Sequence, residues 1–130
     1  MKVISTSVHG VLDYLVGIAL ILAPYLFGFE DYPASAGVAR IVGIAILSYS
    51  LFTRYEWGVV KLIPMNVHLM LDMAGGAFLA VSPWLFGFNN APANVWVPHV
   101  VVGLADVVIA LLSSSSPRDV RTQVPASGRM

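Results

Sequence analysis

The chain of 130 residues contains no cysteine. Disulfide bonds, thiolate zinc sites, iron–sulfur clusters and dithiol relays are therefore excluded. Charged residues are scarce as well, at 11% of the chain, and their formal net charge is +0 at pH 7. Because there is no basic patch with interleaved aromatic residues, we expect no binding of nucleic acid.

Catalytic motifs are also missing. The sequence has no nucleophile elbow, no glycine-rich phosphate loop between a strand and a helix, and no His-Glu-x-x-His zinc motif. The polar connections between its apolar segments are too short to build a separate active site. We therefore expect a protein without enzymatic activity.

Apolar side chains are present in excess. Hydrophobic residues make up 58% of the sequence and the mean hydropathy is +0.81, more than a globular domain of this length can bury. Four apolar runs account for the excess, and each is close to the roughly 20 residues that a helix needs to cross a bilayer. They lack the alternation of strands, so the predicted fold class is an all-α membrane protein with four transmembrane helices. The runs cover about residues 7–28, 34–53, 66–86 and 93–112.

The first half of the chain resembles the second half. The segment from His9 to Asp13 returns as the segment from His68 to Asp72, 59 positions later, and the same offset relates two copies of Leu-Phe-Gly-Phe. Two apolar runs fall in each copy. The sequence therefore predicts two tandem helical hairpins of the same orientation, related by a pseudo-two-fold axis along the membrane normal.

These repeats set the expected domain boundaries. The hairpins cover about residues 7–53 and 66–112, within a transmembrane domain of residues 1–112. Residues 113–130 are polar, contain several helix breakers and have no periodic apolar face. We expect this segment to be a flexible cytoplasmic tail.

The basic residues indicate how the helices are oriented. Lys2 precedes the first run, Arg54 and Lys61 lie between the second and third, and three arginines follow the fourth, whereas the other two connections carry none. By the positive-inside rule both termini are cytoplasmic, in a multi-pass protein of the cytoplasmic (inner) membrane. Asp13 would interrupt the apolar core of a signal peptide, so we expect the first helix to be retained.

A proline and an aromatic residue stand near the end of the first helix of each copy. The second copy has Ser82-Pro83-Trp84 ahead of Leu-Phe-Gly-Phe, and the first has Ala, Pro24 and Tyr25. Proline removes a backbone donor, the aromatic ring suits headgroup depth and the glycine permits a tight turn, which favours a structural corner over a ligand site.

With this signature the chain resembles the SPW repeat family of small integral membrane proteins, over about residues 7–112. The resemblance implies a paired-helix architecture and a membrane location. It implies no particular reaction.

Ionisable residues inside the apolar runs are the most informative for function. Each charge at mid-bilayer costs about 2.5 to 3.5 kcal/mol on insertion scales, and such residues usually face the interior of a bundle. Their spacing places them in three stripes, each on one helix face with one glycine that allows close approach of a neighbouring backbone. The stripes are His9-Asp13-Gly17, His68-Asp72-Gly76 and His99-Gly103-Asp106.

Matched depths in the two copies predict two polar layers. The outer layer contains Arg40 and His99, which are also 59 positions apart. We expect Arg40 to extend toward water or toward the Glu30-Asp31 loop rather than to hold a substrate. The inner layer, toward the cytoplasm, combines histidines with acids: His9, Asp13, His68, Asp72 and Asp106.

Three interpretations of the inner layer remain open. Its side chains can bond across helices and hold the bundle together, at about 0.6 kcal/mol per contact. They can form a path for protons or ions. They can also bind a cofactor, either haem between the two histidines or a divalent metal held by histidines and aspartates, although no cofactor is required by the pattern.

The favoured function is that of a small non-enzymatic membrane component, in contact with the lipid bilayer. We expect it to act as a homo-oligomer or by binding a membrane protein partner, because four short helices enclose only a thin core. The alternative is handling of protons, ions or a metal through the buried histidines and aspartates.

Overall fold

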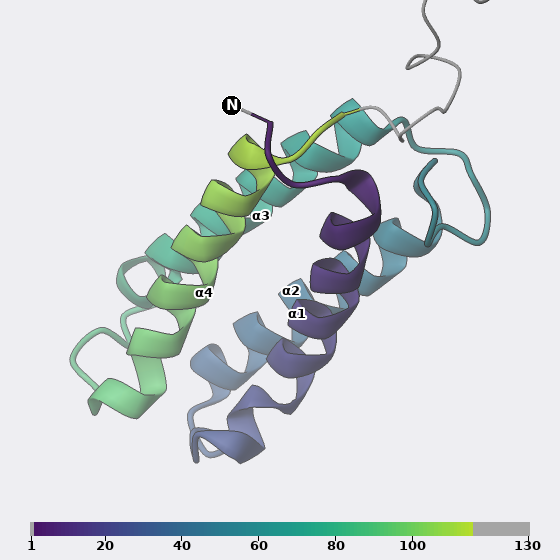
Figure 1. Cartoon of the computed structure of the whole chain (residues 1–130). Helices are drawn as coiled ribbons and strands as arrows, with labels where there is room; N and C mark the ends of the chain where they lie inside the picture. Colours follow the sequence, from purple (N-terminus) through teal and green to yellow (C-terminus); the bar gives the residue numbers. More distant parts are fainter. Residues whose placement is uncertain (1, 116–130) are drawn as a thin grey trace, which may run out of the picture.

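The computed structural model describes residues 2–115, which form four long helices (Figure 1). Each is long and apolar enough to span a membrane, with a mean hydropathy of 1.2 to 2.2. The all-α expectation is confirmed, and the four candidate spans indicate a multi-pass membrane protein in contact with lipid. The helices are α1 (Thr6–Leu26), α2 (Pro33–Leu51), α3 (Met65–Leu85) and α4 (Ala93–Leu112).

Local sequence signals mark where the helices begin. Ser5 caps α1, because its side chain accepts a hydrogen bond of 3.2 Å from the Val8 N–H. Pro33 is the first residue of α2, and Pro64 and Pro92 immediately precede α3 and α4. Proline suits these places because the first N–H groups of a helix have no partner within it.

The first helix of each hairpin ends in the same turn. The Phe29 N–H donates to the Pro24 carbonyl and the Phe88 N–H to the Pro83 carbonyl, each at 2.8 Å. The glycine before each phenylalanine has a φ of 72° or 71°, as the predicted tight turn requires. This closure folds both phenylalanine rings back into the interior, where they are 0% and 6% exposed.

The helices pack as two hairpins, α1 with α2 and α3 with α4, which meet mainly through α2 and α3. Within each hairpin the backbones touch at a pair of glycines. A Cβ atom added to Gly43 would lie 2.7 Å from the Gly17 carbonyl oxygen, and one added to Gly103 would lie 2.5 Å from the Gly76 carbonyl oxygen. The predicted role of the stripe glycines is confirmed at these contacts.

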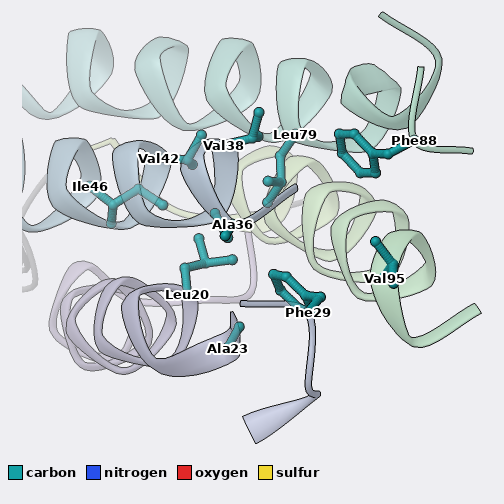
Figure 2. Packing of buried hydrophobic residues seen from close by; sticks show 11 residues of the cluster. Leu20, Ala23, Phe29, Ala36, Val38, Val42, Ile46, Leu79, Phe88 and Val95 are labelled. Atoms are coloured by element: carbon teal, nitrogen blue, oxygen red, sulfur yellow. The ribbon is translucent and has the colours of Figure 1, made fainter. Parts of the chain in front are cut away.

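The two ends of the bundle differ. One end, here the terminal end, holds the N-terminus, the end of α4 and the α2–α3 connection (Figure 1). The other, the turn end, holds the two hairpin turns. A large apolar cluster lies toward the turn end, where Leu20, Phe29, Ala36 and Leu79 point toward one another (Figure 2). A smaller cluster at the terminal end includes Tyr55, Met65, Leu69 and Ala110.

Candidate functional site

Four ionisable side chains from two helices meet near the terminal end. His9 and Asp13 lie one turn apart on α1, and His68 and Asp72 lie one turn apart on α3. None of the four is more than 3% exposed. One nitrogen or oxygen atom from each lies within 4.8 Å of those of the other three. We call these four residues the tetrad.

The tetrad exchanges hydrogen bonds between the two hairpins. His9 Nε2 lies 2.7 Å from Asp72 Oδ2 and 3.0 Å from Asp13 Oδ1. His68 Nε2 lies 2.8 Å from Asp13 Oδ2 and 3.1 Å from Asp72 Oδ2. Each imidazole is therefore closer to the carboxylate of the other hairpin than to the one on its own helix.

A hydroxyl group fixes the second nitrogen of each imidazole. Thr53 Oγ1 lies 2.6 Å from His68 Nδ1 and 2.6 Å from the Tyr49 carbonyl oxygen. Both contacts have hydrogen-bond length, so both contain a hydrogen atom. A hydroxyl has one hydrogen and a carbonyl has none to donate, so the hydroxyl donates to the carbonyl and the Nδ1–H donates to the hydroxyl oxygen. The proton on Nδ1 is thus set by geometry.

Ser113 repeats this arrangement for the other histidine. Its Oγ lies 2.6 Å from His9 Nδ1 and 2.6 Å from the Ile109 carbonyl oxygen. The prediction that Ser113 opens a flexible tail is therefore wrong, because its side chain is fully buried under α1. Backbone bonds that join Ile4 to residues 112 and 114 hold this segment in place. The remainder of the predicted tail, residues 116–130, lies outside the described residues.

These contacts determine the charge of the tetrad. The same argument places one hydrogen between each Nε2 and the carboxylates, so each imidazole carries or shares a second proton. Two such protons balance the two carboxylate charges. The tetrad is therefore electrically neutral as a unit, which lowers the cost of burying it in an apolar bundle.

Two tyrosines complete the hydrogen bonding of the carboxylates. The Tyr49 hydroxyl donates to Asp72 Oδ1, and the Tyr55 hydroxyl, from the α2–α3 connection, donates to Asp13 Oδ2 at 3.1 Å. Burial, reinforced by the nearby Asp13 charge, raises the pKa of the Tyr55 hydroxyl, so it remains a donor. Sequence reasoning missed both tyrosines and both hydroxyl residues, because none of the four belongs to a repeated motif at the 59-residue offset.

The second helices of the two repeats are in fact related by 60 positions. Thr53 and Ser113 make equivalent contacts, because α4 accommodates one additional residue after its N-cap proline. By this offset His99 corresponds to Ala39 rather than to Arg40. The predicted equivalence of Arg40 and His99 is therefore wrong.

The structure also separates those two residues from each other. The Arg40 guanidinium lies 5.2 Å from the centre of the Tyr25 ring, in a cation–π contact. His99 is buried, and its Nε2–H donates to the Ser35 carbonyl oxygen at 2.9 Å. Within residues 2–115 no hydrogen bond or ion pair joins Arg40 to His99. Asp106, the fifth candidate of the inner layer, is buried on α4 beside Gly76 but is not part of the tetrad.

The Ser-Pro-Trp signature builds the end of α3. Pro83 has no N–H for the Leu79 carbonyl, and the Ser82 hydroxyl donates to that carbonyl instead, at 2.7 Å. Ser82 and Pro83 are buried, whereas Trp84 is exposed. The Trp84 ring meets the Trp96 ring edge-on, with 5.8 Å between the ring centres. In the first repeat Pro24 is likewise buried and Tyr25 exposed, but the residue before Pro24 is alanine.

A haem does not fit the tetrad. The two imidazole rings lie 5.4 Å apart at an angle of 77°, and aspartate oxygens are bonded to both Nε2 atoms. The carboxylates thus fill the space that a porphyrin between two axial histidines would occupy. A single small cation is compatible with the same four side chains.

Of the comparisons with known proteins, the match to a family profile agrees with this architecture. No curated protein and no solved structure has a significant match to the chain. The sequence profile of the SPW repeat domain matches residues 7–113, which include all four helices except Thr6, the first residue of α1, and extend to Ser113. This match covers most of the sequence, so the chain belongs to the SPW repeat family.

Proposed function

We propose that this protein is a non-enzymatic component of the cytoplasmic membrane, crossed by all four helices. Its two hairpins have the same orientation and are related by a pseudo-two-fold axis along the membrane normal. Lys2, Arg54 and Lys61 lie at the terminal end and the two hairpin turns carry no basic residue, which favours a cytoplasmic terminal end. The tetrad then lies toward the cytoplasmic side.

In this proposal the tetrad is a clasp that holds the hairpins in one fixed arrangement. The supporting observation is the reciprocal exchange, in which each histidine bonds most closely to the aspartate of the other hairpin. All four side chains are also satisfied by hydrogen bonds within the chain. A closed and neutral network of this kind rigidifies a core and specifies one packing.

The rigid unit would act by association with a second copy or with a larger membrane protein. Long apolar side chains cover the outside of the bundle. Of the most apolar 18-residue stretch of α4, only 28% is buried within the chain. Mass measurement of the protein released from native membranes by mild detergent tests this point. We expect an oligomer or a co-purifying membrane protein, and a strictly monomeric protein without a partner would contradict the proposal.

The clasp is tested separately with His9→Ala. A structural role is supported if His9→Ala is less stable than the wild type and neither protein, in liposomes, passes protons or ions faster than empty liposomes do. Flux that is present in the wild type and absent in a folded His9→Ala protein would instead support a path for protons or ions.

A divalent metal ion is the second candidate, favoured by charge balance. Two protons neutralise the tetrad in its hydrogen-bonded form, and one divalent cation would neutralise the same two carboxylates. The hydroxyl oxygens of Thr53 and Ser113 accept from Nδ1–H, which is the outer hydrogen bond that orients a metal-binding histidine. Two nitrogens and two carboxylate oxygens suit zinc and similar ions.

Elemental analysis of the detergent-purified protein distinguishes this candidate from a clasp. The matched sample is the His9→Ala, His68→Ala double variant, provided that it keeps the helical circular dichroism of the wild type. Near-stoichiometric zinc, iron, copper or manganese in the wild type alone supports the metal site. A metal-free wild type, also after dialysis against these ions, excludes it.

A further inference from the structure

The α2–α3 connection, residues 52–64, lies beside the start of α1 at the terminal end (Figure 1). The Trp57 Nε1–H donates to the Ser7 carbonyl oxygen at 2.8 Å, and the Tyr14 hydroxyl donates to the Trp57 carbonyl oxygen at 2.7 Å. Ser7 and Tyr14 belong to the first turns of α1. The connection is therefore attached to the side of a membrane-spanning helix, at the depth of that helix end.

Backbone hydrogen bonds fix the second half of the connection to the end of α2. The N–H groups of Val59 and Val60 both donate to the Leu51 carbonyl oxygen, at 2.7 and 3.0 Å. The Leu62 N–H donates to the Phe52 carbonyl oxygen at 3.0 Å. The last carbonyls of a helix have no donor within it, so these bonds satisfy them and hold the segment in place.

This fixed segment nevertheless presents apolar side chains at the surface. Val59 is 75% exposed and Leu62 is 63% exposed. At the depth of a helix end, such side chains reach the boundary between the lipid headgroups and the acyl chains, where apolar groups gain by leaving water. The position of the segment thus predicts contact with lipid.

Two cations of the connection are held close together beside these apolar side chains. The Arg54 Nε–H donates to the Lys61 carbonyl oxygen at 3.2 Å, and both side chains are exposed. The Lys61 ammonium donates to the Tyr55 carbonyl oxygen at 3.0 Å. Among residues 2–115 the terminal N–H groups of Arg54 have no acceptor, and neither cation forms an ion pair. Glu56, the acid of the connection, accepts from the Thr6 hydroxyl at 2.6 Å instead. The surface therefore carries two positive charges that no carboxylate balances.

We propose that Arg54 and Lys61, together with Val59 and Leu62, bind an anionic phospholipid of the leaflet at the terminal end. The guanidinium and the ammonium donate to the phosphate oxygens, and a guanidinium matches a phosphate with two parallel N–H groups. The two apolar side chains contact the first carbons of the acyl chains. A zwitterionic phospholipid offers the same phosphate and chains but adds a cation, which the basic side chains repel. The inference rests on the proposed membrane location and requires neither the clasp nor a metal in the tetrad.

Native mass spectrometry of the full chain in mild detergent tests this surface. Titration with dioleoylphosphatidylglycerol or with dioleoylphosphatidylcholine gives the dissociation constant of the first bound lipid. We expect phosphatidylglycerol to bind about 5- to 25-fold more tightly, which is about fivefold for each cation. Equal affinities for the two lipids would overturn the proposal. So would displacement of phosphatidylglycerol by glycerol phosphate at equal affinity, since the acyl chains would then not be recognised.

Neutral replacements of single cations locate the site. Arg54→Gln and Lys61→Gln should each lower the preference for phosphatidylglycerol about fivefold, and Lys61→Gln alone suffices if Arg54→Gln fails to fold. The matched control is Arg40→Gln, because Arg40 lies over the Tyr25 ring toward the turn end. It should keep the wild-type preference. An equal loss in Arg40→Gln would overturn the proposal, since net charge alone would then explain the binding.

A change in the apolar part tests the contact with the acyl chains. Leu62→Ser should weaken the binding of both lipids and leave the ratio of their affinities unchanged. Ile44→Ser, at an exposed apolar residue of α2, is its control and should bind as the wild type does. Unchanged lipid binding by Leu62→Ser would overturn this contact. Release of the chain from vesicles by alkaline carbonate would instead contradict the proposed membrane location, so the two failures are distinguishable.

Discussion

Replacement of Asp72 with asparagine tests the tetrad directly. The Asp72 carboxylate accepts hydrogen bonds from His9 and Tyr49, and its Oδ2 also lies 3.1 Å from His68 Nε2 in an ion pair. Asparagine has nearly the same shape but only one oxygen, and its N–H₂ group would face groups that are themselves donors. The variant also loses one of the two negative charges that balance the tetrad.

The size of the effect follows from these contacts. A hydrogen bond to a charged group contributes about 1.5 to 3 kcal/mol, and the single amide oxygen of asparagine can keep only one of the two that Asp72 accepts on its two oxygens. Removal of one partner from a buried ion pair costs about 3 to 5 kcal/mol. We therefore expect Asp72→Asn to lower the free energy of unfolding by about 3 to 5 kcal/mol, a large share of the roughly 5 to 15 kcal/mol typical of a domain.

Reversible unfolding in mixed dodecyl maltoside and dodecyl sulfate micelles, followed by far-ultraviolet circular dichroism, measures this change. The matched control is Asp106→Asn, the same replacement at a buried aspartate that has no hydrogen-bond or ion-pair partner among residues 2–115. We expect it to cost no more than about 1 kcal/mol. Equal losses in the two variants would refute the reasoning, because the tetrad would then contribute nothing beyond an ordinary buried carboxylate.

Three further predictions use the same unfolding assay. Ser82→Ala removes the hydroxyl that bonds to the Leu79 carbonyl, which Pro83 leaves without a backbone donor, and should cost about 1 kcal/mol. Ala23→Ser adds the equivalent hydroxyl in the first repeat and should stabilise the protein by a similar amount. If Ser82→Ala does not destabilise and Ala23→Ser does not stabilise, the hydroxyl does not have this role. Gly103→Ala would bring a Cβ within 2.5 Å of backbone atoms of α3 and should cost about 1 to 3 kcal/mol, while Gly75→Ala, with no atom within 4 Å, should be neutral or stabilising by up to about 1 kcal/mol. Thr53→Val leaves the buried His68 Nδ1–H without an acceptor and should cost about 1 to 3 kcal/mol at unchanged helical content, and a neutral result would mean that this hydroxyl does not orient the ring.

The helices and their pairing were predictable because they depend on local pattern. The apolar runs agree with the four helices to within two residues at each end. Gly28 and Gly87 have the positive φ expected from the Phe-Gly-Phe turns, and Pro33 is the first residue of α2, where proline is favoured. Each of these features follows from a few adjacent residues.

The members of the tetrad were predictable, but their bonding was not. A spacing of four residues places His9 beside Asp13 on one face of α1, whichever helix lies opposite. Which carboxylate each imidazole prefers depends on how far α1 and α3 are rotated toward each other. The tyrosine and hydroxyl partners lie on α2, the α2–α3 connection and the end of α4, where no repeated motif marks them.

The outer layer was mispredicted because of one residue. A single additional residue in a helix turns every following side chain by about 100°, so an offset of 59 instead of 60 assigns the wrong face. The sequence alone thus determined an all-α chain of two repeated hairpins with ionisable residues on their inner faces, since hydropathy and periodicity are local properties. The register of α4 and the exchange of bonds across the tetrad are set by packing between helices, which no local pattern encodes.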